Sequence, residues 1–412
     1  MDARFTLARP EHRAWAVAEA HRLLDFARSA ADREHGGFTG LDTAGRPVPG
    51  VKPLYATARM TYAFSLGCLL GRPDAELVEH GLAALRGPFA DRAHGGWHAA
   101  LADDGSTVAD GTKTTYAHAF VLLAAATAAT AGFAAADLLD AATEVVDQHL
   151  WAPAERMCVE SYPADWSVPE DYRGVNANMH AVEAFLAAHA ATGDRRWLDR
   201  AAKITARVVS FAAANGWRIP EHFTADWRPL PDYNAGRPAD PFRPYGATPG
   251  HALEWARLVL QVWAQTGDPA LLPAARALFD RAVADAWDLD RYGFAYTTDW
   301  SGRPVVTARL HWPLTEGIGA ARALAAATGE DAYADRYAEF WALADRAYLD
   351  REHGGWWHEL DEDGRPAATI WAGKDDAYHA LQACLLQLLP ANQGLAPYLA
   401  GTASAAVTDG VR

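Results

Sequence analysis

Two histidine–glutamate pairs with the same spacing could carry out proton-transfer chemistry. Glu183 follows His180 by three residues, and Glu254 follows His251 by three residues. On a helix this spacing places both side chains on one face, so a carboxylate can lie near each imidazole. Imidazole accepts and donates protons near neutral pH because its ordinary pKa is about 6.5. An isolated pair is more often structural, but a third histidine, His379, lies in a comparable polar segment and favours a catalytic function.

The same residues give less support to a metal, a nucleotide or a nucleophilic serine. Histidine and carboxylate ligands suit zinc or manganese, but the sequence has no HExxH or similarly tight ligand set. It also has no GxSxG nucleophile motif and no GxGxxG or GxxxxGK phosphate loop. We therefore expect neither a bound metal nor a cofactor.

The charge and cysteine content narrow the classes of partner. The 412-residue chain has 37 basic and 52 acidic residues, for a formal net charge of −15. This excess disfavours binding to nucleic acid or anionic membranes, because acidic groups repel phosphate. No apolar stretch is long enough to span a bilayer. The three cysteines form no CxxC motif and the first ten residues hold no apolar signal-peptide core, so we expect a cytoplasmic protein.

Six repeats organise the chain. Each repeat has a short β-prone run around an Asp/Gly turn, as at residues 36–42, and two helical patterns. One helix is apolar on nearly all sides and the other is amphipathic, which indicates a buried and a surface helix. The apolar helices are expected at residues 53–70, 114–131, 176–191, 250–266, 312–328 and 376–389, and the amphipathic helices at residues 11–31, 73–86, 135–151, 194–213, 268–287 and 331–349.

This alternation predicts an all-α fold. The expected architecture is an (α/α)6 barrel of six inner and six outer helices, with short β-hairpin loops at one end. We expect residues 1–391 to form a single domain. Residues 392–412 are expected to form a C-terminal tail that packs loosely or not at all.

The predicted inner helices carry polar residues at their N-terminal ends, although the rest of each helix is apolar. Equivalent positions in six repeats converge at one mouth of a barrel, and buried polar groups need partners, so this pattern favours a functional cleft. His118 is nevertheless expected in the core, and His35, His94 and His353 are expected to cap hairpin turns. The polar groups are Tyr55 and Arg59; Lys113, Tyr116 and His118; Asn176, Asn178, His180 and Glu183; His251, Glu254 and Arg257; His311, Trp312 and Glu316; and Lys374, Asp375, Asp376 and His379.

Several of these segments resemble the N-acylglucosamine 2-epimerase superfamily, and most closely its bacterial aldose–ketose isomerase branch. The resemblance runs from about residue 10 to residue 390 in consistent order. Its most specific motif is Tyr172-Arg173-Gly174-Val175-Asn176-Ala177-Asn178-Met179-His180-Ala181-Val182-Glu183-Ala184. The other matching segments are Thr57-Ala58-Arg59-Met60, Pro229-Leu230-Pro231-Asp232-Tyr233-Asn234, Thr248-Pro249-Gly250-His251 with Glu254-Trp255, Trp312-Pro313 with Glu316, and Trp371 through Gly373-Lys374 to Tyr378-His379.

The resemblance implies an (α/α)6 barrel and metal-independent proton transfer by two histidines, which match His251 and His379. The implied reaction converts an aldose into its 2-ketose through a cis-enediol, with D-mannose and D-fructose as the expected pair and D-lyxose and D-xylulose as a possible second pair. We expect Glu254 to orient His251.

The remaining expected site residues contact the monosaccharide or support the histidines. We expect His180 to bind a hydroxyl or to assist ring opening, and Glu316 to bind hydroxyls or tune a histidine. Arg59 could also stabilise the charge of an enediolate. Sugar-contacting positions of the superfamily match Arg59, Tyr116 and Asn176, and a further motif position matches Trp312.

Asp375 bears on the choice of sugar. The sulfoquinovose enzymes of this branch carry an amide at the matching position, whereas a carboxylate would repel a sulfonate and accept hydrogen bonds from a neutral sugar. If Asp375 faces the cleft, mannose is favoured. The alternatives are a sulfoquinovose isomerase, a sugar 2-epimerase of the same superfamily, a glycoside hydrolase that uses Glu183, Glu254 or Glu316, and a non-catalytic sugar-binding module.

Overall fold

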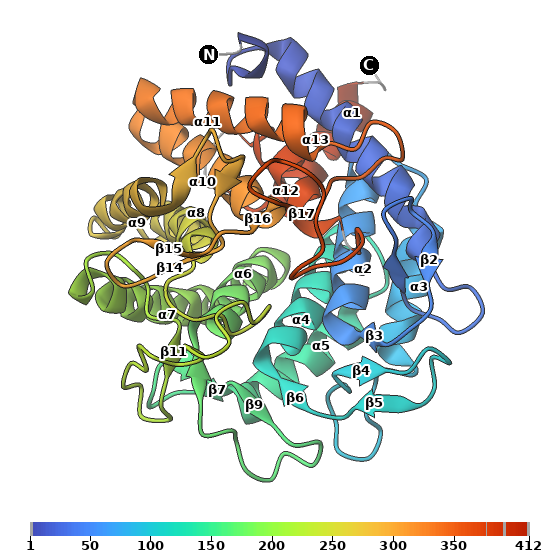
Figure 1. Cartoon of the computed structure of the whole chain (residues 1–412). Coiled ribbons are helices and arrows are strands. Elements are labelled where there is room, and N and C mark those ends of the chain that lie inside the picture. Colours follow the sequence, from blue (N-terminus) through green and yellow to red (C-terminus); the bar gives the residue numbers. More distant parts are fainter. Residues whose placement is uncertain (1–2, 376, 390–392, 410–412) are drawn as a thin grey trace.

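The helices form two concentric rings in the computed structural model, which describes residues 3–375, 377–389 and 393–409, with side chains up to residue 402 (Figure 1). The inner ring comprises α2 (Leu54–Leu69), α4 (Thr115–Thr130), α6 (Val175–Thr192), α8 (Pro249–Thr266), α10 (His311–Thr328) and α12 (Tyr378–Leu386). The outer ring comprises α1 (Pro10–Ala27), α3 (Ala75–Arg86), α5 (Ala136–Val145), α7 (Arg195–Ala214), α9 (Leu271–Ala286) and α11 (Asp331–Leu343). Each inner helix contacts the next and α12 contacts α2, so the inner ring closes. The predicted (α/α)6 barrel is confirmed.

The burial of the two rings follows from their sequences. Inner helix α4 is buried along almost its whole length, from Ala117 to Ala128, because other helices cover it on every side. Outer helix α7 buries Trp197, Ala201, Ile204 and Val208, which recur every three or four residues on one face. A helix with one apolar stripe must lie on the surface with that stripe inward. The sequence pattern therefore separates the two rings.

Glycine ends several inner helices and turns the chain outward. Gly193, Gly267 and Gly329 follow α6, α8 and α10 with φ angles of 72°, 72° and 70°. Glycine is favoured there because left-handed backbone strains residues that have a Cβ atom. The Asp194 side chain then accepts a hydrogen bond from Arg196 N and caps α7. Each of the three glycines lies between a threonine and an acidic residue, in Thr192-Gly193-Asp194, Thr266-Gly267-Asp268 and Thr328-Gly329-Glu330.

Short antiparallel strands surround the end of the barrel where the inner helices begin (Figure 1). Four strands lead directly into inner helices, and each pairs with a strand of the next repeat: β3 (Lys52–Pro53) with β4 (Ala100–Leu101), β6 (Lys113–Thr114) with β9 (Ser161–Tyr162), β10 (Arg173–Gly174) with β11 (His222–Phe223), and β16 (Arg309–Leu310) with β17 (Glu359–Leu360). Strand β5 (Val108–Asp110) extends β4, and the remaining strands form the hairpins β1–β2 (Gly40–Leu41, Pro47–Val48), β7–β8 (Trp151–Ala152, Met157–Cys158), β12–β13 (Trp287–Asp288, Gly293–Phe294) and β14–β15 (Thr297–Thr298, Pro304–Val306). The pairing between repeats fixes the loops that carry the site.

The C-terminal segment packs more closely than expected. Residues Leu395–Asp409 form helix α13, which contacts α2, α4 and α6. Leu395 and Leu399 are buried in the core. The expectation of loose packing is therefore wrong for the start of this helix, whose apolar side chains gain more from burial than the chain loses by ordering. The other helical elements of the described residues are two short 3₁₀ helices, η1 (Ala3–Phe5) and η2 (Arg28–Ala30), and two short π-helices, η3 (Val146–Leu150) and η4 (Ala344–Tyr348).

Candidate active site

A pocket of about 180 Å³ lies at the end of the barrel where the inner helices begin. All six inner helices or the residues just before them contribute to its wall, as the repeat pattern predicts. Glu316 is the one predicted site residue that does not line it. The predicted residues that do are Arg59, Tyr116, Asn176, His180, His251, Glu254, Trp312, Asp375 and His379.

His251 is held by a carboxylate other than the one expected. Its Nδ1 atom lies 3.1 Å from Oε1 of Glu221, whose side chain is 3% exposed. Glu254 instead has its Oε1 atom 3.7 Å from Nδ1 of His180 and 3.7 Å from the guanidinium of Arg257. The prediction that Glu254 orients His251 is wrong in this structure, because the imidazole extends toward the loop before α8 while Glu254 extends toward neighbouring inner helices. Sequence reasoning missed Glu221, whose only signal was a charged residue beside a buried β-prone run.

His379 has a matching arrangement. Its Nδ1 atom lies 3.1 Å from Oε1 of Glu316, and the other oxygen of Glu316 accepts a 3.1 Å hydrogen bond from Nε of Arg257. Both Glu316 and Glu221 lie behind the histidines, outside the pocket lining. A carboxylate at Nδ1 favours the tautomer that carries its proton there, so Nε2 of each ring is left for substrate. Of the two expected roles for Glu316, the geometry fits tuning of a histidine.

The indole of Trp312 lies beside both imidazoles. Its ring centroid is 5.2 Å from that of His251 and 5.9 Å from that of His379, with interplanar angles of 34° in both cases. Gly250 makes room for this indole, since a Cβ atom there would lie 2.4 Å from it. The indole therefore fixes the spacing of the two histidines.

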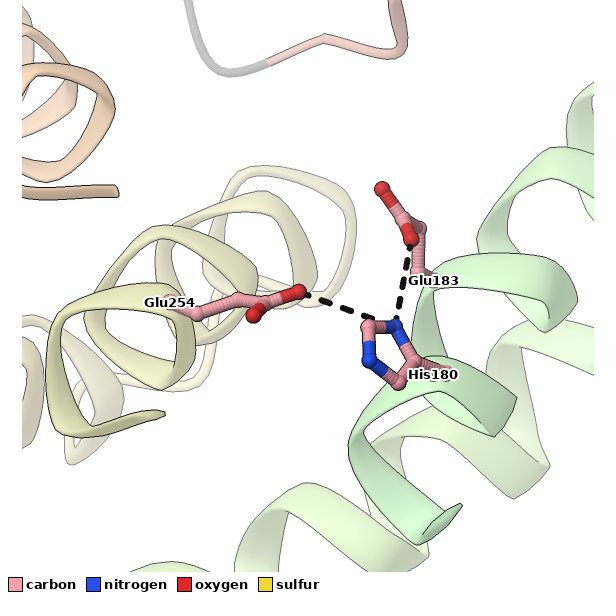
Figure 2. A group of neighbouring side chains, drawn as sticks. All are labelled: His180, Glu183 and Glu254. Atoms are coloured by element: carbon pink, nitrogen blue, oxygen red, sulfur yellow. Dashed lines mark ion pairs between the residues drawn. The ribbon is translucent and has the colours of Figure 1, made fainter. Parts of the chain in front are cut away.

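A layer of buried titratable side chains, formed by His180, Glu183, Glu254 and Arg257, lies next to the histidines. Nδ1 of His180 is 3.7 Å from Oε2 of Glu183 and 3.7 Å from Oε1 of Glu254, and the two carboxylates come from adjacent inner helices (Figure 2). The guanidinium of Arg257 is 3.8 Å from Glu183 and 3.7 Å from Glu254. The hydroxyl of Tyr378 also donates a hydrogen bond to Glu183.

Burial and neighbouring charges shift the pKa values of the groups in this layer in different directions. Burial lowers the pKa of His180 to about 4. Burial raises the pKa of Glu254 well above its ordinary value, and the nearby charge of Glu316 raises it further. Burial would also raise the pKa of Glu183, but the nearby imidazole of His180 and the charge of Arg257 lower it to about 2. Glu254 therefore favours its protonated form more than an exposed glutamate does, and in that form it can donate a hydrogen bond into the pocket that it lines.

By type and spacing, His180, Glu183 and Glu254 could hold a metal ion. Their ligand atoms all lie within 4.8 Å of one another, and imidazole with carboxylates is a proper ligand set for zinc. The guanidinium of Arg257 lies beside both carboxylates, however. This fixed cation already compensates the charge that a metal would compensate, and it would repel a divalent ion.

Arg59 places a second cation at the pocket wall. Its NH2 group donates a 2.9 Å hydrogen bond to the hydroxyl of Tyr116. Its guanidinium carbon lies 4.3 Å from the ring centroid of Phe120 and 4.6 Å from that of Tyr378. Aromatic faces stabilise the charge through cation–π contact. The arrangement presents positive charge to a ligand in an otherwise aromatic wall.

Comparison with known proteins agrees with this geometry. Residues 36–383 match the N-acylglucosamine 2-epimerase (GlcNAc 2-epimerase) family. The chain belongs to this family. It is 49% identical over 403 residues to a D-mannose isomerase from Thermobifida fusca, covering 96% of this chain and 97% of that one. It is 47% identical over 407 residues to a D-mannose isomerase from Pseudomonas cannabina pv. alisalensis, with the same coverage.

Solved structures show the same fold. A D-mannose isomerase crystal structure superposes with a TM-score of 0.86 at 28% identity, covering 92% of this chain and 99% of that one. The cellobiose 2-epimerase of Spirochaeta thermophila DSM 6192 superposes with a TM-score of 0.81 at 23% identity, covering 92% and 96%. The second likeness supports the barrel architecture of this N-acylglucosamine 2-epimerase family member.

Aromatic side chains from two loops meet at the pocket of this family member. Phe242 comes from the loop between β11 and α8, and Trp371 from the loop between β17 and α12; their ring centroids are 5.4 Å apart. Phe242 also packs edge-on against Tyr55 and Tyr116, with centroids 5.9 Å away in each case. Both Phe242 and Trp371 line the pocket. Sequence reasoning missed Phe242, since a single aromatic residue in a long loop gives no periodic signal.

Asp375 lies at the edge of the pocket, where its side chain is exposed. Its Oδ1 atom accepts a 3.3 Å hydrogen bond from the backbone N–H of Leu41. Asp375 therefore lies between the pocket and the solvent. Asp376, the neighbouring residue of the predicted polar group, lies outside the described residues.

Some predicted polar residues do not join the pocket. Nζ of Lys113 lies 2.7 Å from Asp91, and Nζ of Lys374 lies 2.6 Å from Asp350. Each aspartate caps a loop turn, so both lysines are structural. The expectation that His35, His94 and His353 cap these turns is corrected, since backbone N–H groups of the turns bond to Asp32, Asp91 and Asp350.

Other buried polar residues of this family member form hydrogen bonds within the core. His118 Nδ1 donates a 2.7 Å hydrogen bond to the Thr114 carbonyl, as its expected core position requires. The amide of Asn178 bonds to both N and O of Cys158, at 2.7 and 3.2 Å. Within the described residues, no helix is long and apolar enough to cross a membrane.

Proposed function

We propose that this chain is an aldose–ketose isomerase that interconverts D-mannose and D-fructose by proton transfer through a cis-enediol. One observation carries the proposal: His251 and His379 border the same pocket, and each Nδ1 atom lies 3.1 Å from a buried carboxylate. Held in this way, both imidazoles can exchange protons through Nε2. The two D-mannose isomerases that are 49% and 47% identical over nearly the full chain support the choice of substrate.

The reaction needs two proton transfers at carbon and two at oxygen. A base takes the proton from C2 of the ring-opened form of D-mannose, the electron pair of that bond forms the C1=C2 double bond, and O1 gains a proton. The enediol then loses the proton of O2, the carbonyl forms at C2, and C1 gains a proton. His251 and His379 are the groups placed to carry protons, because an imidazole works efficiently in both directions near neutral pH.

The other pocket residues hold the sugar and its developing charge. The guanidinium of Arg59 stabilises negative charge on an enediolate oxygen. Glu254 and His180 line the pocket and can form hydrogen bonds with sugar hydroxyls. Oδ1 of Asn176 lines the same pocket and has no hydrogen-bond partner among the described residues, so it can accept a sugar O–H. Glu183 and Arg257 support this layer from behind.

Two alternatives are less well supported by the geometry. A glycoside hydrolase needs two carboxyl groups that flank the bond to be cleaved. Of Glu183, Glu254 and Glu316, only Glu254 lines the pocket, and all three contact Arg257. For a sulfoquinovose isomerase, the carboxylate of Asp375 at the pocket edge would repel a sulfonate. Both considerations favour a neutral monosaccharide.

The test is a proton NMR assay of the EDTA-treated protein with D-mannose in deuterated water. Fructose with solvent deuterium at C1 is the expected product and would support metal-independent transfer through an enediol. Glucose as the first product would instead indicate 2-epimerisation. Turnover of sulfoquinovose without turnover of mannose would contradict the assignment of Asp375. Activity that EDTA removes and zinc or manganese restores would contradict metal independence.

A further inference from the structure

The carboxylate of Glu221 has one cationic partner available to it. Its side chain is 3% exposed, and neither oxygen has a conventional hydrogen bond to another described residue. Among those residues, the imidazole of His251 is also its only ion-pair partner, at 3.1 Å. A buried carboxylate without a compensating charge is costly, so its presence here calls for a partner that becomes charged.

Three other titratable groups interact electrostatically with Glu221, namely His222, Tyr172 and Tyr296. His222 has Nε2 2.7 Å from the carbonyl of Pro244 and Nδ1 2.6 Å from the hydroxyl of Tyr172. Since the carbonyl can only accept, Nε2 donates and Nδ1 accepts, which is a neutral imidazole. Burial lowers the pKa of His222 and raises that of both Tyr172 and Tyr296. None of the three therefore supplies positive charge.

The backbone around Glu221 is fixed from both sides. The carbonyl of Glu221 accepts a 3.1 Å hydrogen bond from Val175 N at the start of α6. The next residue, His222, pairs with Gly174 in the β10–β11 ladder. The carboxylate thus comes from a segment that links two repeats, and it lies behind the histidine, outside the pocket lining.

The second histidine differs in this respect. Glu316, behind His379, shares its charge with Arg257, whose Nε atom is 3.1 Å away. A fixed guanidinium already compensates Glu316, whereas Glu221 has only the imidazole of His251. The two carboxylates therefore influence their histidines to different extents.

We propose that Glu221 is a positioning residue for His251; this proposal rests on the proposed function. It holds the proton of neutral His251 on Nδ1, directs Nε2 at the sugar, and stabilises the imidazolium formed when His251 takes a proton during turnover. Glu221 touches no substrate and acts only through the ring. No residue of the His251 helix performs this task, since Glu254 faces His180 and Arg257.

Kinetics of Glu221→Gln test the proposal, because glutamine keeps the size of the side chain and removes its charge. We expect kcat to fall about 10²-fold, and KM to stay within about threefold because Glu221 lies outside the pocket. The pH–rate profile of Glu221→Gln should differ from that of the wild type, because the variant has no negative charge beside the proposed proton-transfer ring. Glu221→Asp should recover part of kcat and of the profile.

The matched control is Asp226→Asn, which removes an exposed carboxylate just after β11 (54% side-chain exposure), whereas Glu221 lies just before that strand. We expect wild-type kcat and pH dependence for it. A Glu221→Gln protein that keeps more than a third of kcat with an unchanged pH profile would overturn the proposal. A purely structural role for Glu221 would lower stability while leaving that profile in place.

A measurement on the wild-type chain keeps the proposal testable even if Glu221 variants fold poorly. In ¹⁵N-histidine NMR without sugar, the signals of His251 can be assigned by their loss in His251→Asn. The proposal requires neutral His251 to carry its proton on Nδ1, and a proton on Nε2 instead would refute it. This measurement needs no turnover, so it tests the position of the His251 proton even if the protein does not isomerise mannose.

Discussion

Replacing Gly250 with alanine should disturb both proposed catalytic histidines, because the added methyl group would displace the indole of Trp312. Gly250 lies in the first turn of α8, and a Cβ atom there would lie 2.4 Å from Cζ3 and 2.6 Å from Cη2 of Trp312. Ordinary contacts are 3.4–4 Å, so the indole must move by about 1 Å. Its ring lies beside both His251 and His379, which must move with it or lose their packing.

The size of the effect follows from this displacement. A misplacement of about 1 Å in a catalytic group costs about 10²-fold in rate. Overpacking of a buried site destabilises a protein by about 1–3 kcal/mol. We therefore expect Gly250→Ala to lower kcat for fructose formation from D-mannose about 10²-fold, and to lower the free energy of unfolding by about 1–3 kcal/mol. Initial rates and urea unfolding curves measure the two quantities.

The contact between Gly250 and Trp312 can be tested separately from the loss of activity. Trp312→Phe removes the outer indole ring, so adding Gly250→Ala to it should cost much less than adding Gly250→Ala to the wild type. Gly236→Ala is the matched control, because a Cβ atom there meets nothing within 4 Å; its kcat should stay within about twofold. Equal losses from Gly250→Ala in the tryptophan and phenylalanine backgrounds would refute this account of how the histidines are held apart.

Three further predictions concern the histidines and the buried lysines. His251→Asn and His379→Asn should each lower kcat at least about 10³-fold with unchanged circular dichroism, because each removes a proton-transfer group; activity within tenfold of wild type would exclude that role. Lys113→Met leaves Asp91 buried without its partner and should destabilise the fold by about 3–5 kcal/mol in urea unfolding, with nearly unchanged KM. Burial lowers the pKa of His118 to about 4, so its unfolded form binds the extra proton, and stability should fall by up to about 1.4 kcal/mol per pH unit as the pH drops from 6.5 toward 4. His118→Gln should show a smaller loss of melting temperature between pH 7 and pH 5.

The barrel could be predicted from sequence because each ring leaves its own periodicity. Helix α2 spans Leu54–Leu69, where residues 53–70 were expected, and α7 spans Arg195–Ala214, where residues 194–213 were expected. An all-round apolar pattern has one physical explanation in a chain of alternating helices, namely burial inside a second ring. The C-terminal helix gave no such pattern; among its residues whose burial is described, Leu395, Ala396 and Leu399 are buried.

The partners of the histidines were harder to predict because they depend on where a ring points, which sequence spacing does not specify. Spacing alone paired His251 with Glu254, but the imidazole in the first turn of α8 extends to the loop of the preceding repeat and meets Glu221. Glu254, one turn later, extends toward α6 and meets His180.

The convergence of His251 and His379 was predictable, since equivalent positions of a repeat must meet at the barrel mouth. The carboxylates behind them come from different contexts, one from a helix and one from a loop, because the repeat constrains the inner helices more tightly than the segments between them. Substitutions that alter proton transfer without altering sugar contacts should therefore be sought at Glu221 and Glu316, in the layer behind the pocket.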